Sequence, residues 1–180
     1  MKKESLIYKE ENIVVYLLYM WRLEDTLRAF QFDVERILTV LCLEDEAQEE
    51  ERVFLQELID MMLTEGVKES GHLQVNKNLV SWLTELHNKL LASHKIQKYN
   101  ALYYQVLPTI VELRAKSQKT EISEIETCLE AMYGYSLLEM QGKPISQVTT
   151  EAMLGVKQLM ATLAEVYKQE KAGTFPLENI

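Results

Sequence analysis

The feature that most constrains this chain begins at Ile13, where nine consecutive residues are apolar as far as Trp21. From Ile13 to Leu41 apolar side chains also recur at alternating spacings of three and four, the pattern of a helix packed lengthwise against others. A helix that is apolar on every side must be enclosed on every side. We therefore predict one long central helix over residues 13–41, with a break near residues 31–33 as an alternative.

The rest of the chain shows helical spacing without a strand pattern. Gly66 and the Gly142–Pro144 stretch have helix-stopping chemistry, and Pro108 is expected to kink or restart the helix that contains it. Five further helices are predicted at residues 45–64, 75–92, 96–116, 121–141 and 146–170. The expected fold is an all-α, single-domain antiparallel helical bundle of about six helices over residues 1–180, with a loose tail at 172–180.

Charge and apolar length exclude several classes of function. The net charge of -9 disfavours nucleic-acid binding as a property of the whole surface. Residues 86–119 carry six basic residues and one acid, and we favour their attraction to the acidic residues 44–51 over an anion-binding role. A run of nine apolar residues is too short for a membrane span, which needs about 20. Cys42 and Cys128 are expected to be free thiols of a cytoplasmic protein without an export signal.

A charged cluster follows the apolar run directly, at Arg22, Glu24, Asp25 and Arg28. Spacings of three and four favour a surface ladder of ion pairs worth about 0.2–0.5 kcal/mol each. The alternative is a polar ligand-binding pocket at the edge of the core, which these residues would form with three further side chains, those of His72, His87 and Tyr103. If the protein has a site, this junction is where the sequence places it.

Catalytic and metal-binding patterns are weak. Di-iron bundles use Glu-x-x-His on helices, whereas the match here, Glu69 to His72, contains Gly71 and is expected in a loop. His87 and His94 share a helix face but lack a third ligand. No nucleophile elbow or phosphate-binding glycine loop is present. We predict no catalytic residue, metal or cofactor, and leave open whether residues 65–78 are a binding loop or a plain connector.

Four stretches, read together, resemble one known family: residues 12–25, 65–78, 107–115 and 126–134. This is a family of bacterial proteins of similar size that is classified as a domain of unknown function. The resemblance implies a small intracellular bacterial protein and carries no activity with it.

The functional expectation is a non-enzymatic helical protein that acts by associating with itself, as a homodimer, or with a protein partner. The reason for this expectation is the apolar run at residues 13–21, because six helices could leave part of it uncovered as a subunit interface. The alternative is a small-molecule or anion-binding protein, or an unrecognised enzyme, with its pocket at the end of this run.

Overall fold

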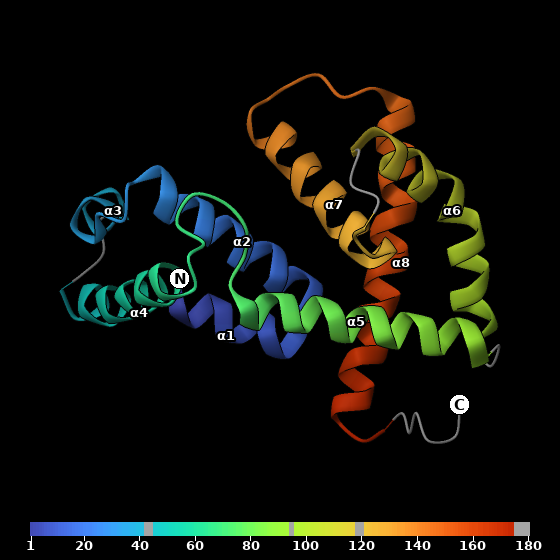
Figure 1. Ribbon diagram of the computed structural model, residues 1–180, viewed down its shortest axis with the longest axis horizontal. Helices are drawn as coiled ribbons and strands as arrows, with labels where there is room; N and C mark the ends of the chain where they lie inside the picture. Colours follow the sequence, from blue (N-terminus) through green and yellow to red (C-terminus); the bar gives the residue numbers. More distant parts are fainter. Residues whose placement is uncertain (42–44, 94–95, 118–120, 175–180) are drawn as a thin grey trace. The chain divides into compact units, whose positions relative to one another are not determined.

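The computed structural model describes residues 1–41, 45–93, 96–117 and 121–174 of the chain (Figure 1). Within these residues it contains α-helices and no β-strand, which confirms the all-α class. The expected number of about six helices is wrong, because the described residues form eight: α1 Lys2–Glu11, α2 Ile13–Ala29, α3 Val34–Leu41, α4 Asp45–Thr64, α5 Gln74–Ser93, α6 Gln97–Ser117, α7 Glu124–Met140 and α8 Gln147–Lys171.

The long helix predicted over residues 13–41 is interrupted between α2 and α3, so its continuous form is wrong and the alternative with a break near residues 31–33 is confirmed. Gln31 and Phe32 have positive φ angles of 55° and 63°. The Phe32 N–H donates to the Leu27 carbonyl and the Gln31 N–H to the Arg28 carbonyl, both at 2.9 Å. These bonds form a Schellman motif, which usually has glycine at its left-handed position. This turn has no glycine to mark the end of the helix in the sequence, and the apolar spacing runs through it without a gap.

Helix α1 was missed because its apolar residues, Leu6, Ile7 and Tyr8, are consecutive and flanked by polar and charged residues, so they form no seam at helical spacing. Its start is fixed by Glu51 of α4, whose carboxylate accepts from the Met1 ammonium group at 2.6 Å and from the Lys2 N–H at 3.0 Å. Tyr19 of α2 donates to Glu4 at 2.8 Å. A short charged helix is thus held by tertiary contacts and not by an apolar face.

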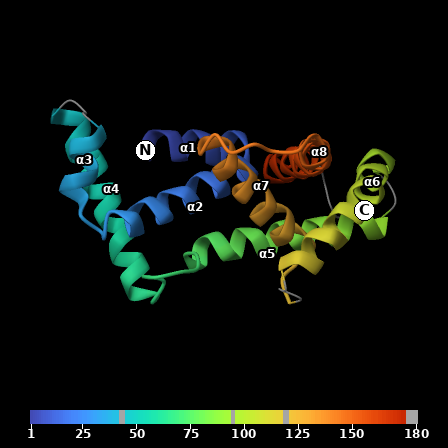
Figure 2. The same cartoon turned by 90° about the horizontal axis from the view of Figure 1, so that it is seen from above.

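The helices group into two compact units, each described here by itself. The first unit contains Met1–Glu11 and Val15–Leu79, in which α4 contacts both α1 and α3. The second contains Asn12–Val14 and Val80–Ile180, in which α8 lies between α6 and α7 (Figure 2). α6 continues through Pro108, and its axis curves in Figure 1 as a proline within a helix predicts.

The apolar run at residues 13–21 is enclosed, as its composition predicted. Six of its side chains are buried, Leu18 and Tyr19 are half-buried, and only Val15 is exposed, at 40%. The run therefore does not provide the uncovered surface that we expected from it.

Helix α5 buries polar as well as apolar side chains. Leu83, Leu86 and Leu90 are at most 1% exposed, whereas Val75 and Trp82 are 45% and 40% exposed. Asn76 and His87 are buried beside the leucines, at 0% and 2% exposed. Among the described residues, no helix has the length and apolar character needed to cross a membrane.

Candidate functional site

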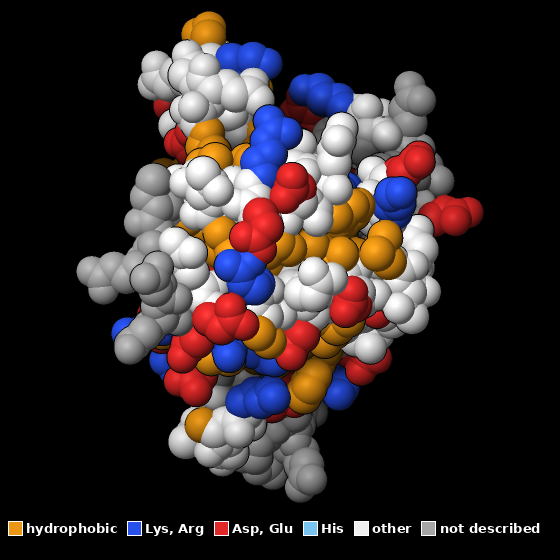
Figure 3. Space-filling model, turned by 90° about the vertical axis from the view of Figure 1, so that its left-hand side faces the viewer, with side chains coloured by type: hydrophobic (Ala, Val, Ile, Leu, Met, Phe, Trp, Pro, Cys, Tyr) orange, Lys and Arg blue, Asp and Glu red, His pale blue; other side chains and the backbone are white. Residues whose placement is uncertain are grey.

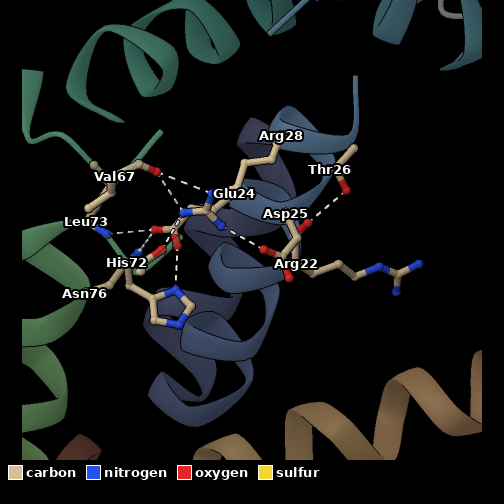
Figure 4. A network of polar contacts seen from close by, with 10 residues as sticks. Arg22, Glu24, Asp25, Thr26, Arg28, Val67, His72, Leu73 and Asn76 are labelled. Carbon is tan, nitrogen blue, oxygen red and sulfur yellow. Dashed lines mark hydrogen bonds and ion pairs between the residues drawn. The ribbon is translucent and has the colours of Figure 1, made fainter. Parts of the chain in front are cut away.

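The candidate site is organised around Glu24, a fully buried carboxylate on α2 (Figure 4). Its Oε1 accepts from the Leu73 N–H at 3.2 Å and from Asn76 Nδ2 at 2.8 Å. Leu73 caps α5, because its carbonyl accepts from the N–H groups of residues 76 and 77. Glu24 thus places negative charge at the N-terminus of α5, where the helix dipole favours it.

His72 contacts the other oxygen of the same carboxylate. Its Nδ1 lies 2.6 Å from Glu24 Oε2, and its ring stacks on Trp21 with centroids 4.1 Å apart and planes at 11°. A carboxylate facing Nδ1 favours the proton on that nitrogen, so the neutral ring carries its lone pair on Nε2. The side chain is 28% exposed. Glu24 and Trp21 together fix both the tautomer and the plane of this imidazole.

Arg28 joins the end of α2 to the loop that follows α4. Its guanidinium donates to the Val67 carbonyl from Nε and Nη2 at 3.3 and 3.1 Å, and also to the Gly71 carbonyl. Nη1 forms an ion pair with Asp25 at 2.7 Å. At the far end of the loop, Glu65 accepts from the Gln74 N–H at 2.6 Å. The loop is therefore fastened along its length.

The structure brings together four of the seven predicted site residues: Glu24, Asp25, Arg28 and His72. Arg22 is exposed, and its side chain points away from the network in Figure 4. The ladder prediction is correct for Asp25 with Arg28 and wrong for Glu24, which is buried and bound to residues of the loop and of α5. His87 and Tyr103 belong to the second unit.

Sequence reasoning missed Asn76 and Trp21 as members of this network. One signal was available, because Glu24 stands seven residues after Leu17, which is fully buried. A carboxylate at an apolar position of a helix seam needs a buried partner. The partners could not be identified, since His72 and Asn76 lie 48 and 52 residues further along the chain.

An open hollow adjoins the Arg28 end of this network. It is lined by side chains from the end of α2, the turn after it, α4 and the loop: Arg28, Gln31, Phe32, Leu63, Lys68 and Glu69. The two residues of the turn that have positive φ angles, Gln31 and Phe32, both contribute to its wall. The hollow thus combines two cations, one carboxylate, one amide and an apolar surface.

The predicted residues of the second unit form a separate buried cluster. His87 Nδ1 lies 2.6 Å from the Tyr99 hydroxyl, and Nε2 lies 3.5 Å from Glu124. Burial lowers the pKa of His87, and the Glu124 carboxylate opposes this only in part. Tyr103 packs its ring edge-on against His87, and burial with Glu124 nearby raises the pKa of Tyr103 to about 12. The geometry is that of a neutral histidine hydrogen-bonded within the core.

The metal and thiol predictions concern residues of both units. In the described part of the chain, no three His, Cys, Asp or Glu side chains are grouped so as to hold a metal ion. Cys128 is a free, buried cysteine, and burial raises the pKa of its thiol to about 12. Such a thiol stays protonated and unreactive at neutral pH. Cys42, His94, Lys95 and Lys119 lie outside the described residues.

Comparison with known proteins gives one match. A family model described as "Domain of unknown function (DUF4924)" matches residues 5–174. No curated protein and no solved structure matches the chain.

Proposed function

The chain belongs to the DUF4924 family, a domain of unknown function, and from this premise we propose that it acts without catalysis, by binding a protein through one side of α7. The observation that supports the proposal is the composition of this helix. From Ala131 to Met140 it carries a single charge, Glu139, and apolar side chains occur on all its sides. A helix that is apolar on all sides is expected to pack against other elements on all sides.

One side of α7 has that cover within the second unit. Ile125, Cys128 and Leu129 are fully buried there, and the helix contacts both α6 and α8. The opposite side holds Gly134, Leu137 and Leu138, at spacings that place all three on one face. Gly134 and Leu137 are half-buried, a Cβ added to Gly134 would meet no atom within 4 Å, and Leu138 is 38% exposed. Met140 at the end of the helix is 56% exposed.

This side of α7 differs from the surface of α4 that exposes Val53. Val53 on α4 is 46% exposed, but it shares a shallow hollow with Arg52, Glu57 and Asp60. In Figure 3, which shows the face around α3 and α4, hydrophobic side chains are interspersed with many charged ones. Interspersed charge is typical of a surface that stays in water. Uncharged apolar surface is typical of the core of an interface.

The experiment is native mass spectrometry of the protein isolated from its own cells. We expect a complex heavier than the 21.0 kDa chain, lost in Leu138→Glu and retained in the matched variant Leu154→Glu. Leu154 is a suitable control because it lies on α8 and is 57% exposed. A wild-type protein found only at the mass of one chain would overturn the proposal, as would a complex that survives Leu138→Glu.

A second candidate function is favoured by the hollow beside Arg28. Its lining would suit a small molecule with an anionic group and an apolar part, the anion near Lys68 and the apolar part against Phe32 and Leu63. Titration with inorganic phosphate and with benzoate tests this. We expect shifts of the amide resonances of residues 68 and 69, weakened in Lys68→Gln and unchanged in Lys77→Gln. Absence of shifts with either anion would remove this candidate.

A further inference from the structure

We infer that the hollow beside Arg28 binds the zwitterion of an α-amino acid with an apolar side chain. Lys68 pairs with the carboxylate of this ligand and Glu69 with its ammonium group, while Phe32 and Leu63 contact its side chain. The inference rests on the second candidate function, since it names the class of ligand for the same hollow. It adds a cationic group to the anionic and apolar parts of that ligand.

The two charged groups that meet the ligand have no partner of their own. In the part of the chain that the structure describes, the exposed side chains of Lys68 and Glu69 form no hydrogen bond or ion pair. They belong to consecutive residues that line the same hollow with opposite charges. An α-amino acid carries its ammonium and carboxylate groups on one carbon atom, so a single small ligand can meet both. A simple anion would be attracted by Lys68 but repelled by Glu69.

Arg28 holds the wall of the hollow and leaves the ligand to Lys68. Its Nε and Nη2 donate to the Val67 carbonyl, Nη2 also donates to the Gly71 carbonyl, and Nη1 pairs with a carboxylate of its own helix (Figure 4). The two carbonyls lie on either side of residues 68–70 in the chain. The guanidinium therefore fixes the backbone that carries both charged side chains, and a backbone fixed before binding loses little entropy when a ligand binds.

The apolar wall is built by a strained turn. Phe32 is half-buried and has a φ of 63°, and Leu63 in the last turn of α4 is 49% exposed. Bulky residues rarely adopt positive φ angles, and residues strained in this way cluster at ligand-binding sites. The hydrogen bond from the Phe32 N–H to the Leu27 carbonyl holds the turn in place. The turn thus presents an aromatic side chain to the hollow, beside an exposed leucine.

The test is a titration of the full chain, followed by NMR, with L-phenylalanine and with two analogues that each lack one of its charges. Phenylpropionate has no ammonium group, and phenethylamine has no carboxylate. We expect phenylalanine to shift the amide resonances of residues 31, 32, 68 and 69. It should bind about three- to fivefold more tightly than either analogue, because each exposed ion pair contributes modestly. Glycine, which has both charges and no apolar side chain, should bind more weakly than phenylalanine.

Two substitutions separate the two charges. Glu69→Gln should remove the preference for phenylalanine over phenylpropionate, and Lys68→Gln should remove the preference over phenethylamine. Both replace exposed side chains, so the fold should be retained. The matched controls are Glu57→Gln and Lys77→Gln, which change the same charges outside the lining of the hollow and should keep both preferences.

The outcomes separate this inference from the second candidate function. Phenylpropionate or glycine bound as tightly as phenylalanine would overturn the inference, as would a preference for phenylalanine that survives Glu69→Gln. If phenylpropionate still shifts residues 68 and 69 in those cases, the second candidate function stays in place. Absence of shifts with phenylalanine would also overturn the inference. Absence of shifts with phosphate and benzoate as well would remove both.

Discussion

Glu24 and His72 lie 48 residues apart in the chain, and their side chains meet at 2.6 Å in the interior of the first unit. The contact joins the middle of α2 to the residue that precedes the cap of α5. It also converts a buried carboxylate, which would be costly alone, into a group with three hydrogen-bond partners. The contact is therefore an anchor for the first unit as well as the centre of the candidate site.

Replacing Glu24 by glutamine should destabilise the protein. The change removes a charge-assisted bond to His72 and the favourable charge at the start of α5, and we expect a loss of about 1.5–3 kcal/mol in the free energy of unfolding. Urea denaturation measures this. Glu57→Gln on the exposed side of α4 is the control and should change it by less than about 0.5 kcal/mol. Equal stability of both variants would contradict a structural role for Glu24.

Replacing Arg28 by lysine should loosen the loop. A lysine cannot reproduce the planar set of donors that binds the carbonyls of Val67 and Gly71 and pairs with Asp25. We expect faster hydrogen exchange at the amides of residues 67–73 and a stability loss of about 1–2 kcal/mol. Arg22→Lys on the same helix is the matched control. Unchanged exchange in Arg28→Lys would show that the loop is held in another way.

Replacing Gln31 by glycine should stabilise the protein. Gln31 adopts a φ of 55°, and a left-handed conformation costs a residue with a Cβ about 1 kcal/mol. We expect a higher urea midpoint for Gln31→Gly. The opposite sign is expected for Gln158→Gly, at an exposed position inside α8, because glycine within a helix costs about 1 kcal/mol. A loss of stability in Gln31→Gly would contradict strain at this turn.

The stability of the protein should depend on the protonation of His87. Its pKa is lowered in the folded protein, so below the unfolded pKa of about 6.5 the unfolded chain binds the proton more readily. The contribution of His87 is thus fully present above that pKa and is lost as the pH falls toward the folded value. Unfolding free energies between about pH 7.5 and 5.5 measure this. The decrease should be smaller in His87→Gln, and an equal decrease in both proteins would contradict it.

The sequence determined those helices whose ends and apolar faces depend on residues close to them in the chain. Gly66 and Gly142 adopt the positive φ angles of helix stops, and Asn12 Oδ1 caps the start of α2 by accepting from the Val14 N–H at 3.0 Å. The expected bounds of residues 45–64 agree with those of α4. These features depend on neighbours three or four residues away, which is why they can be read from the chain.

The candidate site could be predicted only in part. Its position at the end of the apolar run followed from the sequence, and four of its residues were named. The change of Glu24 from a surface charge to a buried anchor could not be predicted, because its energy depends on distant partners. The break near residues 31–33 could be named only as an alternative, since a Schellman turn without glycine leaves the apolar spacing intact.

The sequence alone therefore determined the helical class, most helix ends and the enclosure of residues 13–21, since each depends on local hydrogen bonding or on the cost of exposing apolar groups. Only the tertiary structure decided which polar groups are buried and which apolar side of α7 is left uncovered. The physical reason is that burial is a property of what packs against a side chain, and helices distant in sequence supply that packing.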